Sequence, residues 1–274
     1  MTKVAAIIPS LASEETKPYL KLCVESLRSS GFDGQIIVVT NGGVLEPLNG
    51  INGISKRLHT KDQGQANAVN IGAQAADNTD YLFVVNDDMY FSPGWDKNLR
   101  FDYPVFSPNL VEPADNAGSA PPFLKLNGGF TLEEFDEEKV RIWIDRETHK
   151  EIGQEEPGFN FPLFIRKDLW TCINGYDVAY DPWGSNSDTD LQTKINLAGV
   201  TPMRLRDVLV YHFSNKSGTF DGTHQDYYQN NIDYFKEKFG FDRDSVEGCD
   251  VWYNKNMLPT DESKIKYKQA KYEE

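Results

Sequence analysis

Three apolar segments near the N-terminus, separated by helix-compatible stretches, constrain the fold of this chain most strongly. Buried strands are expected at residues 3–10, 34–43 and 80–88. Between them, residues 18–31 carry apolar side chains at helical spacing, and residues 64–78 are small and Ala-rich. Alternation of strand and helix predicts a parallel sheet with helices on its faces. We therefore expect an α/β fold: one Rossmann-like domain with a mostly parallel central sheet flanked by helices.

Polar residues stand at the end of each strand, as Pro9-Ser10, Thr40-Asn41-Gly42 and Asn86-Asp87-Asp88. In sheets of this kind, ligands bind at the carboxyl ends of the strands, so these tips are expected to line one crevice. The adjacent carboxylates of Asp87 and Asp88 repel each other, which indicates either open solvent or a bound cation. Oxygen ligands of this type suit Mg²⁺ or Mn²⁺ bridged to a diphosphate. A helix cap or a solvated turn is the alternative interpretation.

Charge and composition exclude several classes of protein. The 274 residues carry a formal net charge of -14, which argues against general binding to nucleic acid or to anionic membranes. The three cysteines, Cys23, Cys172 and Cys249, are widely spaced and odd in number, so a disulfide framework and a zinc site are not expected. No apolar run reaches the roughly 20 residues of a membrane span, and the N-terminus lacks a signal peptide pattern. We expect a cytoplasmic protein with no membrane span.

The remaining chain is less regular. Residues 109–129 are rich in Pro, Gly and Asn and are expected to form a loop, and the charged segment 129–158 is expected to contain a hairpin through Val140 to Ile144. Further elements are expected as follows: a strand and short helix at 159–175, a helix at 187–199 capped by Ser187 or Asp188, a strand at 208–218, and an amphipathic helix at 227–240. The charged C-terminal tail is expected to fray.

Several of these segments together resemble a known family. The stretches "VAAIIPS", "GQIIVVTNGG", "GQANAVNIGAQAADN" and "DYLFVVNDDMYFSPGW" look like the nucleotide-sugar half of an inverting glycosyltransferase of family 2, with the GT-A fold. The stretches "FNFPLFIRKDLWTCINGYD", "DPWGSNSDTDLQTKINLAGV" and "VLVYHFS" resemble its acceptor half. The resemblance implies a single GT-A domain over residues 1–274, with a donor half at about 1–100, an acceptor half at about 101–240 and an extension at 241–274.

The resemblance also implies roles for individual residues. It implies nucleotide binding by Pro9, Ser10, Asn41, Gln65, Asn70, Asn86 and Asp87. Asp88 occupies the last position of the family's Asp-x-Asp motif and His212 matches its late histidine, so both are expected to bind Mn²⁺ or Mg²⁺. Asn41 and Asn86 stand where the family usually has acids. Read alone, His212 is also typical of a hydrogen-bonding core histidine.

On the acceptor side, Asp188 matches the acid that the family uses as general base toward an acceptor hydroxyl. A helix cap, or an acid favoured by the helix dipole, is the alternative reading for Asp188. Its neighbour Ser187 departs from the family's Glu. Asp190 is expected to be structural or to bind the acceptor, and Trp183 either stacks on a sugar or packs.

The implied function is transfer of a sugar from a nucleotide diphosphate donor, a UDP-sugar above all, to a hydroxyl acceptor such as a glycan or glycoconjugate. Two alternatives remain open. A sugar nucleotidyltransferase would resemble "GGxGTRL" near the N-terminus, where this chain has "PSLASEE". A degenerate nucleotide-sugar or glycan-binding protein would explain the departures at Asn86 and Ser187.

Overall fold

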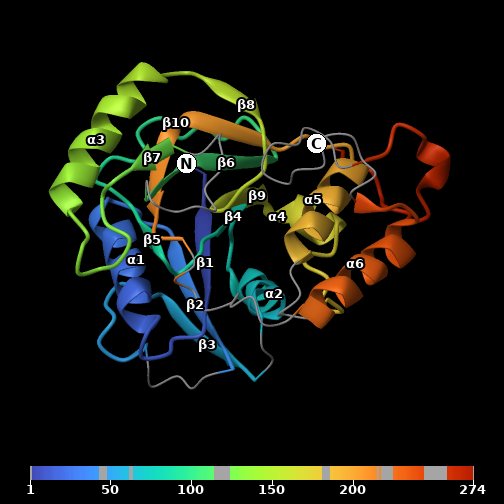
Figure 1. The fold of residues 1–274 in the computed structure, drawn as a ribbon, viewed down its shortest axis with the longest axis horizontal. Coiled ribbons are helices and arrows are strands. Elements are labelled where there is room, and N and C mark those ends of the chain that lie inside the picture. Colours follow the sequence, from blue (N-terminus) through green and yellow to red (C-terminus); the bar gives the residue numbers. More distant parts are fainter. Residues whose placement is uncertain are drawn as a thin grey trace.

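The computed structural model describes residues 2–42, 48–61, 64–113, 124–180, 186–214, 216, 225–243 and 258–273. A twisted sheet runs through its centre (Figure 1). Its strands are β1 (Val4–Ser10), β2 (Gln35–Asn41), β3 (Lys56–Thr60), β4 (Tyr81–Val84), β5 (Met89–Tyr90), β6 (Val105–Pro113), β7 (Leu124–Leu126), β8 (Glu155–Pro157), β9 (Leu163–Arg166) and β10 (Met203–His212). They lie in the order β3-β2-β1-β4-β9-β6-β10-β5, with β7 beside β6 and β8 beside β10.

The N-terminal part of the sheet is parallel, as its sequence predicts. Strands β3, β2, β1 and β4 are paired in parallel, so their carboxyl ends meet at one edge. Strand β9 runs antiparallel between β4 and β6, and β10 returns parallel to β6. The expected α/β fold with a central sheet is confirmed.

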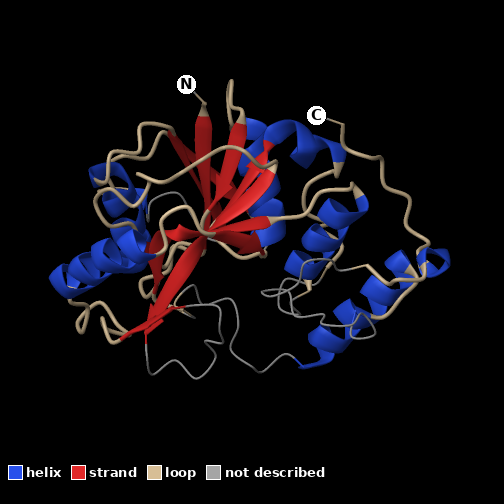
Figure 2. Cartoon of the chain, turned by 90° about the horizontal axis from the view of Figure 1, so that it is seen from above, coloured by secondary structure: helices blue, strands red, loops and turns tan. Residues whose placement is uncertain are grey.

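Helices cover both faces of this sheet. They are α1 (Lys17–Ser29), α2 (Gln65–Ala75), α3 (Glu137–Lys150), α4 (Lys167–Cys172), α5 (Ser187–Leu197) and α6 (Gln225–Phe239), and a short 3₁₀ helix, η3, spans Glu262–Lys264. Helices α1 and α3 lie on one side, and α2, α4, α5 and α6 lie on the other (Figures 1 and 2). Among the described residues, no helix combines the length and the apolar character needed to cross a membrane.

Close packing of α2 against the sheet explains its small residues. A Cβ added at Gly72 would lie 2.4 Å from Cγ2 of Ile7 and 3.3 Å from Cγ2 of Val39. The strands below are fully apolar at this level, and Ile7 and Val39 are both completely buried. Because a side chain at position 72 would push the helix outward, the Ala- and Gly-rich sequence lets α2 approach the strand tips.

Two sequence expectations for the middle of the chain are wrong. The segment through Val140 and Ile144 is the helix α3 and not a hairpin, and both side chains are buried on one face, four residues apart. The Asp136 carboxylate accepts a hydrogen bond from the Lys139 backbone N–H at 3.0 Å, which caps the helix and overrides the local β-type alternation. The expected loop at 109–129 contains the end of β6 and all of β7, and its residues 114–123 lie outside the described part.

The described part of the C-terminal tail is packed onto the helices. The Lys266 N–H donates to the Phe239 carbonyl at 2.8 Å, and the Tyr272 N–H donates to the Ala198 carbonyl at 2.9 Å. Tyr272 also donates its hydroxyl to Asp168. These contacts attach residues 258–273 to the ends of α5 and α6 and to α4, where fraying was expected.

Candidate active site

The tips of β1, β2 and β4 meet at the carboxyl edge of the sheet, as the sequence predicts. Ser10, the last residue of β1, donates its hydroxyl to Asp87 Oδ2 at 2.5 Å. In the parallel register Ser10 lies beside Thr40, which precedes Asn41 at the end of β2. Asn41 is 5% exposed and its side-chain oxygen has no hydrogen-bond partner among the described residues. This edge therefore presents buried polar groups from three strands.

Asp87 is buried next to another carboxylate. Its side chain is 1% exposed, and its Oδ1 has no hydrogen-bond partner among the described residues. Burial, together with the neighbouring charge of Asp88, raises the pKa of Asp87 to about 8, against the opposing hydrogen bond from Ser10. A positive charge bound here would relieve this cost.

His212 forms the centre of a three-residue contact with Asp88 and Glu112. His212 Nε2 lies 3.2 Å from Asp88 Oδ1, and His212 Nδ1 lies 2.8 Å from Glu112 Oε1. Burial by itself lowers the pKa of His212, but Asp88 and Glu112 outweigh it and raise this pKa to about 10. Burial by itself raises the pKa of Asp88, but the His212 imidazolium and the Lys216 backbone N–H, at 3.0 Å from Oδ2, hold it below its usual value.

Glu112 was not predicted from the sequence. It lies in β6, is 4% exposed, and fixes one nitrogen of His212 so that the other points toward Asp88. The available signal was a charged residue inside an otherwise apolar strand, which is rarely buried without a partner. Its partner is far away in the sequence, so the pairing itself was not readable.

These residues fit a divalent cation. Two neighbouring ligands of an octahedral Mg²⁺ ion, each about 2.1 Å from it, lie about 3 Å apart. Asp88 Oδ1 and His212 Nε2 are 3.2 Å apart, and the carboxylate of Glu112 supports the imidazole as carboxylates commonly do in metal sites. Within the described part of the chain, no group of three or more His, Cys, Asp or Glu residues is arranged as a metal site. Mg²⁺ is usually bound through one or two carboxylates and completes its shell with substrate phosphates and water.

Asp188 lies in the first turn of α5, but it is not the helix cap. The N-cap is Asn186, whose side chain makes no capping hydrogen bond, so the expected cap at Ser187 or Asp188 is wrong. Asp188 Oδ1 accepts hydrogen bonds from the Tyr176 hydroxyl at 2.7 Å and from Gln65 Nε2 at 3.0 Å. Burial raises the pKa of Asp188 to about 6, while these two hydrogen bonds act in the opposite direction. A carboxylate with this pKa can accept a proton near neutral pH.

Gln65 and Asn70, both expected to bind the nucleotide, form hydrogen bonds with residues of the acceptor half in this structure. Gln65 donates a hydrogen bond to Asp188, and the side-chain amide of Asn70 donates to the Tyr176 carbonyl and accepts from the Tyr176 N–H. Tyr176, which no sequence pattern singled out, thereby becomes part of the surroundings of Asp188. Helix α2 thus connects the N-terminal strands to α5.

Asp190 lies on a different face of α5, in a buried charge network. It is fully buried, and its carboxylate contacts Lys238 at 2.5 Å, Lys194 at 3.3 Å and the Tyr180 hydroxyl at 3.1 Å. Lys238 also pairs with Asp177. This network joins α5 to α6, which favours the structural reading of Asp190 over contact with an acceptor.

The other predicted residues are placed as follows. Pro9 is buried in β1, and Asn86 is partly exposed at the strand tip, where its carbonyl accepts a hydrogen bond from the Cys23 thiol at 3.5 Å. Trp183 lies outside the described residues.

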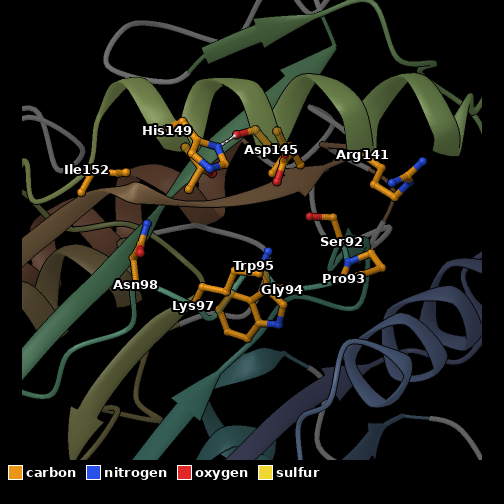
Figure 3. Close-up of a pocket in the computed structure, with 12 residues that line it drawn as sticks. Ser92, Pro93, Gly94, Trp95, Lys97, Asn98, Arg141, Asp145, His149 and Ile152 are labelled. Atoms are coloured by element: carbon orange, nitrogen blue, oxygen red, sulfur yellow. Dashed lines mark hydrogen bonds between the residues drawn. The ribbon is translucent and has the colours of Figure 1, made fainter.

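A separate pocket lies between α3 and the loop at residues 92–98 (Figure 3). Its volume is about 70 Å³, well below the roughly 300 Å³ of the smallest typical ligand pockets. Side chains of α3, among them Arg141 and His149, line one side, and Trp95 and Lys97 line the other. None of the residues predicted for the site lines this pocket.

Comparison with known proteins agrees with this geometry. Residues 6–100 match the family model described as "Glycosyl transferase family 2". Among solved structures, one similar chain is GalNAc-T7 in a crystal structure with UDP, GalNAc and Mn²⁺. It is 16% identical with a TM-score of 0.55, over 85% of this chain and 48% of that one. Residues 1–349 of TarS from S. aureus are 13% identical with a TM-score of 0.51, over 88% of this chain and 74% of that one.

The chain has the GT-A fold. The match to family 2 confirms the predicted resemblance over residues 6–100, and the two solved structures extend the shared fold over most of the chain. The chain spans about half of the length of the GalNAc-T7 chain. No curated protein matches the sequence.

Proposed function

We propose that this GT-A protein is a metal-dependent inverting glycosyltransferase that moves a sugar from a UDP-sugar to a hydroxyl group of a glycan or glycoconjugate. The observation that carries the proposal is the contact between His212 and Asp88 at the carboxyl edge of the sheet, 3.2 Å apart and held by Glu112. The family 2 match supports the donor class, and the UDP and Mn²⁺ bound to GalNAc-T7 support the nucleotide and the ion.

The donor is proposed to bind at the strand tips. Residues 1–100 would form the donor half, 101–240 the acceptor half and 241–274 an extension of the same domain. Pro9 and Ser10 would lie beside the nucleoside, and the free oxygen of Asn41 would accept a hydrogen bond from the base. Asn86 and Asp87 would face the ribose and diphosphate.

Asp88 and His212 would hold Mn²⁺ or Mg²⁺ on the diphosphate. The ion, when bound, neutralises negative charge that develops on the leaving nucleoside diphosphate. His212 must lose its Nε2 proton to bind the ion, and Glu112 keeps the Nδ1 side of the ring fixed as it does so.

Asp188 is the proposed general base. Its Oδ2 takes the proton from the acceptor hydroxyl while that oxygen forms a bond to the anomeric carbon and the bond from this carbon to the diphosphate oxygen breaks. The nucleoside diphosphate leaves with the bonding electrons. A single displacement from the face opposite the leaving group inverts the anomeric configuration.

The test is nucleotide release from a panel of sugar nucleotides, namely UDP-glucose, UDP-galactose, UDP-N-acetylglucosamine, UDP-N-acetylgalactosamine and GDP-mannose. Each is incubated with the protein in Mn²⁺ and in EDTA, and the Asp188→Asn variant serves as control. We expect release of UDP from one UDP-sugar in Mn²⁺, little in EDTA, and little from the variant. Product anomers read by NMR report inversion or retention.

Other results would point to the alternatives. Tight UDP-sugar binding without release, with or without glycan acceptors, identifies a binding protein. Pyrophosphate release from UTP and a sugar 1-phosphate identifies a nucleotidyltransferase. Release that is equal in EDTA removes the metal from the proposal.

A further inference from the structure

We propose that Gln65 and Tyr176, with Asn70 behind Tyr176, are positioning residues that occupy one oxygen of Asp188 and reserve the other for the acceptor proton. This inference rests on the proposed function, since it concerns how the general base is oriented. It assigns to helix α2, which lies in the donor half, control over the base on α5.

The two hydrogen bonds to Asp188 fall on the same atom. The Tyr176 hydroxyl donates to Oδ1 at 2.7 Å and Gln65 Nε2 donates to Oδ1 at 3.0 Å. Among the described residues, none donates a hydrogen bond to Oδ2. A carboxylate held by two donors on one oxygen cannot rotate freely, so its second oxygen keeps a fixed direction.

Tyr176 is itself fixed by α2. Asn70 Nδ2 donates to the Tyr176 carbonyl at 2.9 Å, and the Tyr176 N–H donates to Asn70 Oδ1 at 3.0 Å. The preceding residue, Gly175, has a φ of 53°, and a Cβ there would lie 2.6 Å from Asn70 Oδ1 and 2.8 Å from the Trp170 ring. Glycine therefore lets this turn come close enough for both backbone hydrogen bonds.

Helix α2 supplies both Gln65, which bonds Asp188, and Asn70, which holds Tyr176. Gln65 is the first residue of α2 and Asn70 lies further along the same helix, which packs on β1, β2 and β3. The tips of β1 and β2 are the proposed donor site. A shift of α2 on donor binding would therefore move Gln65 and Tyr176 together and change the direction of Asp188 Oδ2.

The charged groups packed against α5 contact Asp190 and not Asp188. Lys194 and Lys238 both contact Asp190 on a different face of the helix, and Tyr180 donates its hydroxyl to Asp190. Burial raises the pKa of Asp188, and the hydrogen bonds from Tyr176 and Gln65 lower it to a smaller extent. Loss of either donor removes stabilisation of the carboxylate, so the pKa of Asp188 must rise.

The chain offers a matched pair of variants. Tyr176 and Tyr180 are 3% and 4% exposed, and each donates its hydroxyl to an acid of α5. Tyr176→Phe removes the hydrogen bond to Asp188, whereas Tyr180→Phe removes one to Asp190. The pH dependence of kcat/KM is measured for both. In parallel, the Asp188 carboxyl is titrated by ¹³C NMR, with Asp188→Asn used to assign its signal.

We expect Tyr176→Phe to move the acidic limb of the pH profile and the Asp188 titration upward by about one to two pH units, as loss of one hydrogen bond to a charged group predicts. Tyr180→Phe should leave both unchanged. Gln65→Leu removes the other donor and should shift both in the same direction, which keeps the test available if Tyr176→Phe does not fold.

The two readouts separate this inference from the proposed function. Transfer activity with an unchanged pH profile and titration in Tyr176→Phe and Gln65→Leu overturns the inference alone. If the Asp188 titration shifts upward in the variants but the protein turns over no sugar nucleotide, the hydrogen bonds of Tyr176 and Gln65 to Asp188 are supported. The proposed function is then contradicted. Equal shifts in Tyr176→Phe and Tyr180→Phe would overturn the assignment, since the effect would then be one of general packing.

Discussion

His212 is the last residue of β10 and Asp88 directly precedes β5, and His212 Nε2 lies 3.2 Å from Asp88 Oδ1. The backbone reinforces this contact, because the Phe213 N–H donates to the Asp88 carbonyl at 3.0 Å. Strand β5 pairs antiparallel with β10 here, so His212 lies opposite Met89, the residue after Asp88. The pairing of β5 with β10 therefore brings Asp88, in the turn before β5, next to His212.

Asp88→Asn should remove the metal dependence of nucleotide binding. The amide is a poorer ligand for Mn²⁺ than a carboxylate, and the variant keeps the size of the side chain. Calorimetry of UDP binding in Mn²⁺ and in EDTA measures the effect, with Asp102→Asn on the surface as control. We expect wild type and control to bind more tightly in Mn²⁺ and Asp88→Asn to bind equally weakly in both. A variant that keeps the full Mn²⁺ effect would exclude Asp88 as a ligand.

Glu112→Gln should weaken Mn²⁺ binding without contacting the ion. Glu112 accepts a hydrogen bond from His212 at 2.8 Å, and loss of such a supporting carboxylate typically lowers metal affinity by about 10–100-fold. Electron paramagnetic resonance of free Mn²⁺ gives the affinity. Glu137→Gln is the control, because Glu137 also accepts a hydrogen bond, from the Tyr90 hydroxyl at 3.0 Å, but has none from His212. Equal affinity in wild type and Glu112→Gln would show that His212 needs no support from Glu112 or is not a ligand.

Asp87 predicts a pH-dependent stability of the metal-free protein. An acid whose pKa is raised from 3.8 to about 8 on folding binds its proton more tightly in the folded state, so its contribution to stability falls as pH rises from about 4 to 8. Asp87→Asn removes this ionisation. In EDTA we expect the variant to match wild type near pH 4 and to melt progressively higher as the pH rises, by about 10 °C at pH 8.

Thermal melts at the two pH values test this expectation, and Asp102→Asn again serves as control. A variant that melts below wild type at pH 8 would mean that ionised Asp87 is well stabilised without a metal.

Asp188→Asn and Asp190→Asn should separate turnover from stability. Asp188→Asn removes the general base, which typically costs a factor of about 10²–10⁴ in rate, while UDP affinity and melting temperature stay close to wild type. Asp190→Asn leaves Lys194 and Lys238 short of a buried carboxylate and should lower the free energy of unfolding by roughly 3–5 kcal/mol.

Steady-state transfer rates and chemical denaturation of both variants provide the measurement. Near-normal transfer by Asp188→Asn would exclude it as the base. Loss of transfer by a stable Asp190→Asn variant would move that role to Asp190.

Local patterns in the sequence determined the scaffold. Apolar runs ending at Ser10, Asn41 and Asp88 were enough to predict parallel strands and a polar edge, because side-chain burial and strand ends are encoded within a few neighbouring residues. The same reasoning failed at α3, where the alternation around Val140 suggested a hairpin. A helix cap at Asp136 and packing of α3 on β10 decided the outcome there.

Only the tertiary structure decided which side chains meet. Glu112 reaches His212, and Asn70 reaches Tyr176, through hydrogen bonds between segments about a hundred residues apart, with |i−j| of 100 and 106. A single sequence records the chemistry of each group but not its partner, so the hydrogen bonds that the Asn70 and Gln65 amides make around Asp188 were not foreseen. The partner depends on how β6, β10, α2 and α5 pack, because the favoured packing gives most buried polar groups a hydrogen-bond partner.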